Sequence, residues 1–410
     1  MTRALCWLWI AAAWPLAAGE YERRVEAVTR TPGFVALWDF VKRDGGRFEA
    51  HKAKSETADL RLDAANFVLD YWGEGREATY DDFPLVGEGP FGQAVRFRKE
   101  TDASFRPVLL VPRERLHGSA IDVKGPGRSV SMVVWLRRQD GDHAIAGIWH
   151  EGTDLKDAAG AAKRVEQGRR QYALFAGLAA NNGAVAAHVS ENGGKSFGDK
   201  YARNISVTRR RMTGGWDVAA FSFDNQRNTV TSYLNGEAED YWIDSPERHP
   251  FFQWPARGWL QAQLAATPGR QPGEDPDFPR DQFYTPPEGK PLERTLISES
   301  ASQRVELHRF AFTKVRVTLR RDRRGRWRGV EKRELVSLRV NPFWFGHDLY
   351  SPPGPEAGGP FTIGRVIHSG RSAGITGEIG GVAVFGRALD ASRMRRLASV
   401  AAGGPIRADR

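Results

Sequence analysis

The sequence predicts an all-β protein: a two-sheet β-sandwich of the jelly-roll type. Three observations predict it. Many short segments alternate apolar and polar residues, and turn signals separate them. The 44 glycines and 23 prolines interrupt the chain often, while 22 phenylalanines and 13 tryptophans suit half-buried pleated surfaces. Nowhere does a strand pattern alternate with a long helical pattern, which argues against a parallel α/β sheet.

The clearest expected strand is 127–139, where apolar residues recur at every second position from Val130 to Leu136. Two such runs flank the polar turn 224–228, and Asn235-Gly236 closes the second run, so 216–240 is expected to be a hairpin. Short helices are expected over 20–33 and over 390–402, where Asp390 would be the N-cap. Further strands are expected within 33–40, 91–100, 107–116, 143–152, 171–194, 304–321, 332–345, 360–370 and 374–389.

Residues 245–303 form a different kind of segment. Ten of the 23 prolines lie between positions 245 and 291, a density that disfavours regular strand ladders. Aromatic residues in the same segment need something to pack against, so we expect an ordered insertion rather than a flexible linker. The expected organisation is one domain over 20–402 containing the insertion 245–303, followed by a disordered tail over 403–410.

The first nineteen residues have the features of a secretory signal peptide. Arg3 supplies the positive start, 4–14 is an apolar run too short to span a bilayer, and 17–19 are small residues suited to cleavage. The alternative is an uncleaved membrane anchor. We therefore expect a periplasmic or extracellular protein, with no transmembrane segment after signal removal. The mature chain would have no disulfide, because the only cysteine is Cys6.

The formal net charge is +10, or +9 once Arg3 is removed with the signal. An excess of this size favours acidic partners such as an anionic polysaccharide, a cell-wall polymer or nucleic acid. The alternative is that the charge only keeps the protein soluble. For an exported protein we expect a polysaccharide partner, acidic given the charge, and no nucleic acid.

Several segments together resemble a known family. The segments are FVALWDF (34–40), SVSMVVWLRR (129–138), WDVAAFSFDNQRNTVTSYLNGE (216–237) and GEIGGVAVFGRALDASRMRRL (377–397). In this order they resemble LamG-like domains of the concanavalin A-like lectin/glucanase superfamily, over roughly 33–240 and 360–402. The resemblance implies a two-sheet jelly roll, and a function among lectins, adhesion modules, glycosidases and lyases. The chain departs from the family at Gly380-Gly381, where an acidic pair is usual.

Four residues are candidates for catalysis. His150 and Glu151 follow one another at the end of an expected strand, and His188 could lie on the same rim. Arg304 begins an Arg-x-Glu-x-His pattern that places Glu306 and His308 on its own face. This pattern resembles one strand of jelly-roll alginate lyases, whose companion motifs are missing here. The alternative for all four is an ordinary structural or surface role, and the two-carboxylate strand of the glucanase branch is not found.

Aromatic rings are the candidates for stacking on sugar, because their flat apolar faces match the C–H face of a pyranose. The alternative is that these rings fasten the proline-rich insertion to the sandwich. No metal site is expected from the histidines; calcium is implied only weakly, by the resemblance, with Asp217 and Asp224 as available ligands. The aromatic candidates are Trp242, Trp254, Trp259, Trp344 and Tyr350.

The expected function is therefore non-catalytic recognition of a polysaccharide by an exported protein. Two alternatives stay open: a polysaccharide lyase or glycoside hydrolase on the same jelly roll, and an adhesion or structural protein of the cell envelope. Convergence of the four catalytic candidates in one cleft would favour an enzyme. Their separation, with aromatic rings along a groove, would favour binding.

Overall fold

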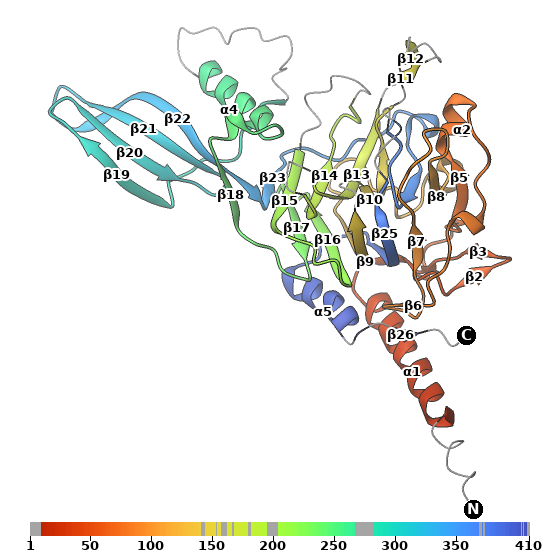
Figure 1. The fold of residues 1–410 in the computed structure, drawn as a ribbon. Helices are drawn as coiled ribbons and strands as arrows, with labels where there is room; N and C mark the ends of the chain where they lie inside the picture. Colours follow the sequence, from red (N-terminus) through yellow and green to blue (C-terminus); the bar gives the residue numbers. More distant parts are fainter. Residues whose placement is uncertain are drawn as a thin grey trace, which may run out of the picture.

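The computed structural model describes residues 10–140, 144–152, 154–156, 162–165, 168–178, 182–194, 204–266, 282–368, 371, 374–402, 404 and 406–407. Two large antiparallel sheets pack face to face and enclose the main hydrophobic core. A five-stranded sheet projects from one side of this sandwich (Figure 1). The chain is thus mostly β, as the sequence predicts.

The first large sheet has the strand order β23-β17-β16-β9-β25-β1-β4, and β7 pairs with β25. The expected hairpin at 216–240 forms its β16–β17 pair, with Asp224 opposite Thr229 at the turn. The strands are β1 (Phe34–Trp38), β4 (His51–Lys52), β7 (Val95–Phe97), β9 (Val130–Asp140), β16 (Asp217–Asp224), β17 (Thr229–Leu234), β23 (Phe343–Trp344) and β25 (Thr376–Phe385).

The second large sheet has the order β15-β14-β13-β10-β24-β8-β5. Its strands are β5 (Asp63–Asn66), β8 (Pro107–Val111), β10 (Ala144–His150), β13 (Arg169–Ala176), β14 (Ala184–Val189), β15 (Asn204–Arg211) and β24 (Phe361–Ile363). Smaller elements fill the connections: β2 (Arg43–Asp44), β3 (Arg47–Phe48), α2 (Phe67–Trp72), η1 (Tyr80–Asp82), β6 (Glu88–Gly89), α3 (Arg113–Leu116), β11 (Asp154–Lys156), β12 (Ala162–Val165), η2 (Pro246–Arg248) and η4 (Pro355–Ala357).

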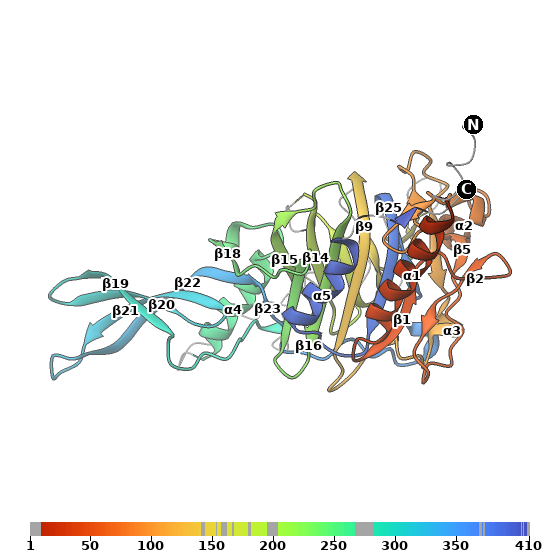
Figure 2. The same ribbon diagram turned by 90° about the horizontal axis from the view of Figure 1, so that it is seen from below.

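Strand β9 shows how the sequence pattern builds the core. Its alternate apolar residues from Val130 to Leu136 face the second sheet, as predicted. The residues between them are also buried, because α5 (Ala391–Ala402) and the C-terminal half of α1 (Ile10–Thr29) pack on the outer face of the first sheet (Figure 2). Trp135 packs there and donates its Nε1–H to the carbonyl of Leu397 at 3.2 Å. The N-cap prediction at Asp390 is confirmed, since its Oδ1 accepts the Arg393 backbone N–H at 2.9 Å.

Close packing explains why the chain has Gly380-Gly381 at the position where the resemblance implies an acidic pair. A Cβ at Gly380 would lie 2.5 Å from Pro90 Cδ, and one at Gly381 would lie 2.6 Å from the ring of Phe91. Both distances are far below van der Waals contact, so the segment around 90–91 can close on β25 only if these positions lack side chains.

The projecting sheet, called the arm below, is built from residues 241–244 and 293–341. Its strand order is β18 (Tyr241–Asp244), β22 (Trp327–Asn341), β21 (Thr313–Arg321), β20 (Gln303–Arg309) and β19 (Glu293–Glu299). The strands expected within 304–321 and 332–345 do form, and β21 and β22 pair as a hairpin, but within the one expected domain they build this separate sheet instead of joining the sandwich. Alternation along a strand identifies the strand but does not say which sheet it joins.

The described residues of the insertion 245–303 contain the helix α4 (Gln253–Ala265), whose Pro255 sits in the first turn where proline is tolerated, and strand β19, which follows the proline-dense stretch 245–291. One further expectation needs correction. In the expected tail 403–410, Ile406–Arg407 forms β26 and pairs with β6; Gly404 is the only other tail residue described.

Residues 1–9 of the expected signal peptide, Cys6 included, lie outside the described part of the chain. Among the described helices, none has the length and apolar character needed to cross a membrane.

Candidate functional site

The arm carries an open cavity of about 590 Å³, called the arm groove below. Its floor is one face of the sheet, and the connecting segment 288–291 closes one side. The helix α4 lies beside this end of the arm (Figure 1) and is tied to it by a hydrogen bond of 2.6 Å between Gln263 and Arg333. The lining residues are Glu288, Gly289, Pro291, Arg294, Arg304, Glu306, His308, Phe310, Val317, Leu319, Trp327, Arg328, Val330 and Arg333.

Strand β20 supplies the centre of the groove. Alternate residues of a strand share a face, so Arg304, Glu306 and His308 lie together, as predicted. Glu306 is buried and takes part in two contacts: its Oε1 lies 2.7 Å from Arg304 Nε, and its Oε2 lies 2.7 Å from His308 Nε2. The carboxylate is thereby fixed between a guanidinium and an imidazole.

Burial raises the pKa of Glu306, but the hydrogen bond with His308 and the charge of Arg304 outweigh it and hold that pKa below its ordinary value of 4.5. The folded state therefore favours the carboxylate more than the unfolded state does. The resulting stabilisation is complete above pH 4.5 and is lost as the pH falls through the folded-state pKa.

This linkage predicts the behaviour of Glu306→Gln. At neutral pH we expect the variant to be less stable by about 1.5–3 kcal/mol, the range for hydrogen bonds to charged groups. The difference from wild type should shrink as the pH is lowered below 4.5, because protonation removes the same interaction. Urea unfolding at a series of pH values measures this; a difference that grows on acidification would contradict the assignment.

Four arginines reach the arm groove, against two carboxylates, Glu288 and Glu306. Arg333 is paired with Glu288, and Arg304 also contacts Glu299 at 3.3 Å. The remaining two, Arg294 on β19 and Arg328 on β22, are exposed. The guanidinium groups of Arg294 and Arg328 can therefore bind an acidic ligand without breaking the ion pairs that Arg304 and Arg333 make within the arm.

Trp327 adds a half-buried indole to the same cavity, with the guanidinium of Arg321 lying 4.4 Å from its ring centroid. The sequence did contain a signal for this part of the groove, the basic run 319–329. From sequence alone, a basic run of this kind is equally typical of a solvent-exposed hairpin tip. The sequence analysis therefore did not predict that Arg294, Arg328 and Trp327 line one site.

The rim candidates form a separate cluster on the second large sheet. His150 is fully buried, and its Nδ1 accepts the Gly152 backbone N–H at 2.9 Å. Burial lowers the pKa of His150 to about 3, with a further contribution from Arg169. The imidazole is therefore neutral at physiological pH and cannot deliver a proton as a charged acid.

Glu151 is held by partners that the sequence did not indicate. Its Oε2 lies 3.0 Å from His368 Nε2 and 3.9 Å from an Arg170 nitrogen, and its Oε1 accepts the Trp149 indole N–H at 3.3 Å. Burial alone would raise its pKa, but His368 and Arg170 lower the pKa to about 2. Glu151 is therefore ionised at neutral pH, and its carboxylate is held by Trp149, Arg170 and His368.

His188 belongs to the same neighbourhood but not to an open cleft. Its ring packs on Trp149 with the ring centroids 4.1 Å apart, and both side chains are buried. Arg304 lies in the arm, in a different sheet from β10 and β14. Glu151 and His188 both contact Trp149, while the ring of His150 packs against Tyr71 and Arg304 lies in another sheet, so the four candidates do not converge.

The aromatic candidates also separate. Trp259 and Trp344 are buried: the Trp259 indole donates to Glu288 at 3.2 Å, and Trp344 meets Tyr284 edge to face at 5.3 Å. These two rings pack inside the protein, where they hold the insertion in place. Because they are buried, the prediction that they stack on sugar is wrong. Trp254 is half-buried in the first turn of α4.

The other two aromatic candidates keep partly exposed rings. Trp242, on β18, is flanked by Lys314, whose Nζ lies 5.0 Å from the ring centroid. Tyr350 lines an open cavity of about 520 Å³ together with Glu191 and Asn192. Neither ring lies in the arm groove.

The two acidic residues considered as calcium ligands accept hydrogen bonds that stabilise turns. Asp217 accepts hydrogen bonds from Thr213 and Asn235, and Asp224 accepts the backbone N–H groups of Gln226 and Arg227. Within the described ranges, no group of three or more histidine, cysteine, aspartate or glutamate side chains could hold a metal. Neither Asp217 nor Asp224 thus belongs to a cluster of that kind in the described chain.

Neither a family model nor a curated protein matches the sequence. Solved structures show distant likeness. Domain 4 of AbnA, an extracellular arabinanase from Geobacillus stearothermophilus solved with arabinotriose, has a TM-score of 0.37 at 12% identity, covering 89% of this chain and 98% of that one. The carbohydrate-binding module of a Ruminococcus gnavus sialidase has a TM-score of 0.33 at 9% identity, covering 74% and 96%. TM-scores below 0.5 do not establish a shared fold, so the fold description rests on the strand order.

Proposed function

We propose that the protein is an exported, non-catalytic recognition module for acidic polysaccharides on a LamG-like sandwich, and that the arm groove is its binding site. The observation that supports this is the presence of four arginines and Trp327 around one cavity of about 590 Å³. The planar guanidinium group matches carboxylate and sulfate geometry with two parallel hydrogen bonds. An indole offers the flat apolar surface on which a sugar ring can lie.

The spacing of the exposed arginines favours a polymer over a single sugar. Arg294 lies on β19 and Arg328 on β22, which are three strand positions apart in the order β22-β21-β20-β19. Three strand spacings correspond to about 14 Å. A ligand that touches both guanidinium groups must therefore extend over more than one ring, as a polysaccharide does.

Export is the second part of the proposal, and the signal features of 1–19 support it. The packing of α1 is compatible with cleavage after Gly19. Tyr21, Val25 and Val28, which pack against the first sheet, all follow that position. Tyr21 also donates to Asp39 at 2.9 Å, so the mature chain would keep these contacts.

Binding should depend on the ligand charge and on the two exposed arginines. We expect wild type to bind polygalacturonate, and not its fully methyl-esterified form, with an affinity that falls as salt is added. The double variant Arg294→Ala/Arg328→Ala should lose at least about tenfold in affinity, since each charged hydrogen bond is worth roughly 1.5–3 kcal/mol. Isothermal titration calorimetry measures both effects.

The matched control is Arg30→Ala/Arg227→Ala, which removes the same charge from two side chains that are 79% and 82% exposed and lie outside the arm. Equal losses in the two double variants would show that only net charge matters and would overturn the site. Assays for reducing ends on the same mixtures test the enzyme alternative; release of new ends would replace the proposal with a lyase or hydrolase.

One observation favours the adhesion alternative. Leu292, Leu296 and Ile297 are at least half exposed along the arm edge β19 and its approach. In the part of the chain that the structure describes, β19 is the edge strand of the arm and pairs with β20, so its outer edge offers backbone groups to a partner. This alternative predicts no binding to acidic polymers, and a protein contact that Ile297→Lys abolishes.

A further inference from the structure

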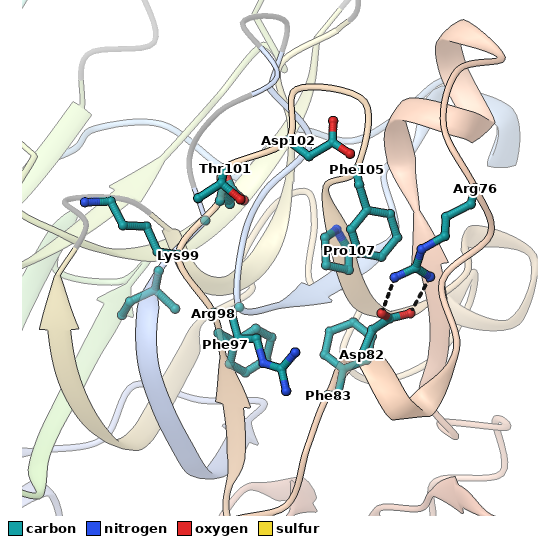
Figure 3. Close-up of a pocket in the computed structure, with 14 residues that line it drawn as sticks. Arg76, Asp82, Phe83, Phe97, Arg98, Lys99, Thr101, Asp102, Phe105 and Pro107 are labelled. Atoms are coloured by element: carbon teal, nitrogen blue, oxygen red, sulfur yellow. Dashed lines mark hydrogen bonds and ion pairs between the residues drawn. The ribbon is translucent and has the colours of Figure 1, made fainter.

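A third cavity, of about 270 Å³, opens at the end of β7 in the sandwich, far in the fold from the arm groove. It lies between the segment 76–83, the loop 98–107 and the chain around Gly364 and Gly374 (Figure 3). We call it the sandwich pocket. None of the predicted site residues lines it.

The floor of the sandwich pocket is aromatic. Phe83 and Phe97 are buried and meet edge to face with centroids 5.8 Å apart. Phe105, partly exposed, forms a further wall, and the guanidinium of Arg76 lies 3.8 Å from its ring centroid. At Gly374 a Cβ would lie 2.1 Å from Glu100 Oε1, so the missing side chain lets the Glu100 carboxylate lie close to the chain there.

Equal numbers of cationic and anionic side chains line the sandwich pocket. Three cations, Arg76, Arg98 and Lys99, line it together with three carboxylates, Asp82, Glu100 and Asp102. Figure 3 shows the Arg76–Asp82 pair on one side and Lys99 with Thr101 on the other. The arm groove has an excess of cations, so the two sites differ in the charge of the ligand they suit.

The carboxylates are held in place by neighbours, which leaves further acceptor positions for a ligand. Asp102 Oδ1 accepts both the backbone N–H and the hydroxyl of Ser104 at 2.8 Å. Glu100 lies 2.6 Å from buried Arg365 and 3.6 Å from Arg106. A carboxylate has about four lone-pair positions, so hydroxyl groups can still donate to these oxygens.

From these observations we propose that the sandwich pocket binds one neutral sugar ring. Such a ring has an apolar C–H face that suits the partly exposed Phe105, and hydroxyl groups at its edge that suit fixed carboxylates and cationic donors. Pockets for drug-sized ligands start near 300 Å³, so this cavity suits one ring rather than a chain. The inference is independent of the function proposed for the arm groove.

Titration with glucose, galactose, mannose, xylose and arabinose, followed by NMR of the full chain, tests this inference. We expect at least one of them to bind at millimolar concentration. Asp102→Asn and Phe105→Ala should each weaken that binding about tenfold. Both side chains reach the surface, and thermal melting confirms that the variants are folded.

Two controls separate this site from others. Asp81→Asn, an exposed neighbour outside the pocket, and Arg294→Ala/Arg328→Ala in the arm should leave the affinity unchanged. The inference is overturned if none of the five sugars binds, or if binding keeps its affinity in both Asp102→Asn and Phe105→Ala. A loss confined to the arm variant would likewise place the neutral sugar in the arm groove and refute the inference.

Discussion

Replacing Asn341 with alanine is expected to lower the free energy of unfolding by about 3 kcal/mol, because the change leaves several buried polar groups without their hydrogen-bond partner. Asn341 is fully buried at the end of β22, where the arm meets the sandwich. Its Oδ1 accepts the Ser206 hydroxyl at 2.8 Å and the Ser232 backbone N–H at 3.0 Å, and its Nδ2 donates to the Ser232 carbonyl at 3.0 Å. Ser206 is on β15 and Ser232 on β17, so one side chain ties the arm to both large sheets.

Urea unfolding of Asn341→Ala beside Asn225→Ala measures this effect. Asn225 makes an exposed hydrogen bond to Asp348 at 2.9 Å, so its removal should cost less than about 1 kcal/mol. Limited proteolysis should also release the arm of Asn341→Ala faster than that of wild type. If the two asparagine variants lose the same stability, Asn341 is not the tie between arm and sandwich.

Trp38→Ala is expected to cost about 3–5 kcal/mol, the range for removing a large aromatic side chain from a core. Trp38 is fully buried on β1, in the first sheet, and its ring stacks on Phe361 of β24, in the second sheet, at 5.0 Å and 17°. Its indole N–H also donates to the carbonyl of Leu60 at 2.8 Å. The variant therefore loses a contact between the sheets, a hydrogen bond and much buried apolar surface at once.

Trp38→Phe is the graded comparison, because a phenyl ring keeps the stacking but not the hydrogen bond. We expect it to lose clearly less stability than Trp38→Ala when both are unfolded in urea. A loss below about 1 kcal/mol for Trp38→Ala would contradict the packing of the two sheets through this pair.

The strands of the sandwich could be predicted because their signal is local. In 127–139 and 216–240, alternation and turn residues indicate the strands directly, and β9, β16 and β17 follow them. The helix at 390–402 was predictable for the same reason, with Asp390 as its cap. The close approach of Phe91 to Gly381 could not be predicted, since 290 residues separate them in the chain.

The arm could not be predicted from the same signals. β20, β21 and β22 alternate like any other strands, and only their pairing with β18 and β19 sets them apart from the sandwich. Arg304, Glu306 and His308 were placed on one face because a period of two is enough to do so. Arg294 and Arg328 join them only through the order of strands in the sheet, which the alternation of residues does not specify.

The central claim, that the arm groove binds acidic polysaccharide, is tested most directly by the indole N–H signals of the ten tryptophans that follow Gly19, in an NMR titration with an acidic galacturonate oligosaccharide. We expect the Trp327 signal to shift in proportion to occupancy, while those of buried Trp38 and Trp135 stay in place. Binding that leaves Trp327 unshifted, or that shifts only indoles outside the arm, would contradict the account.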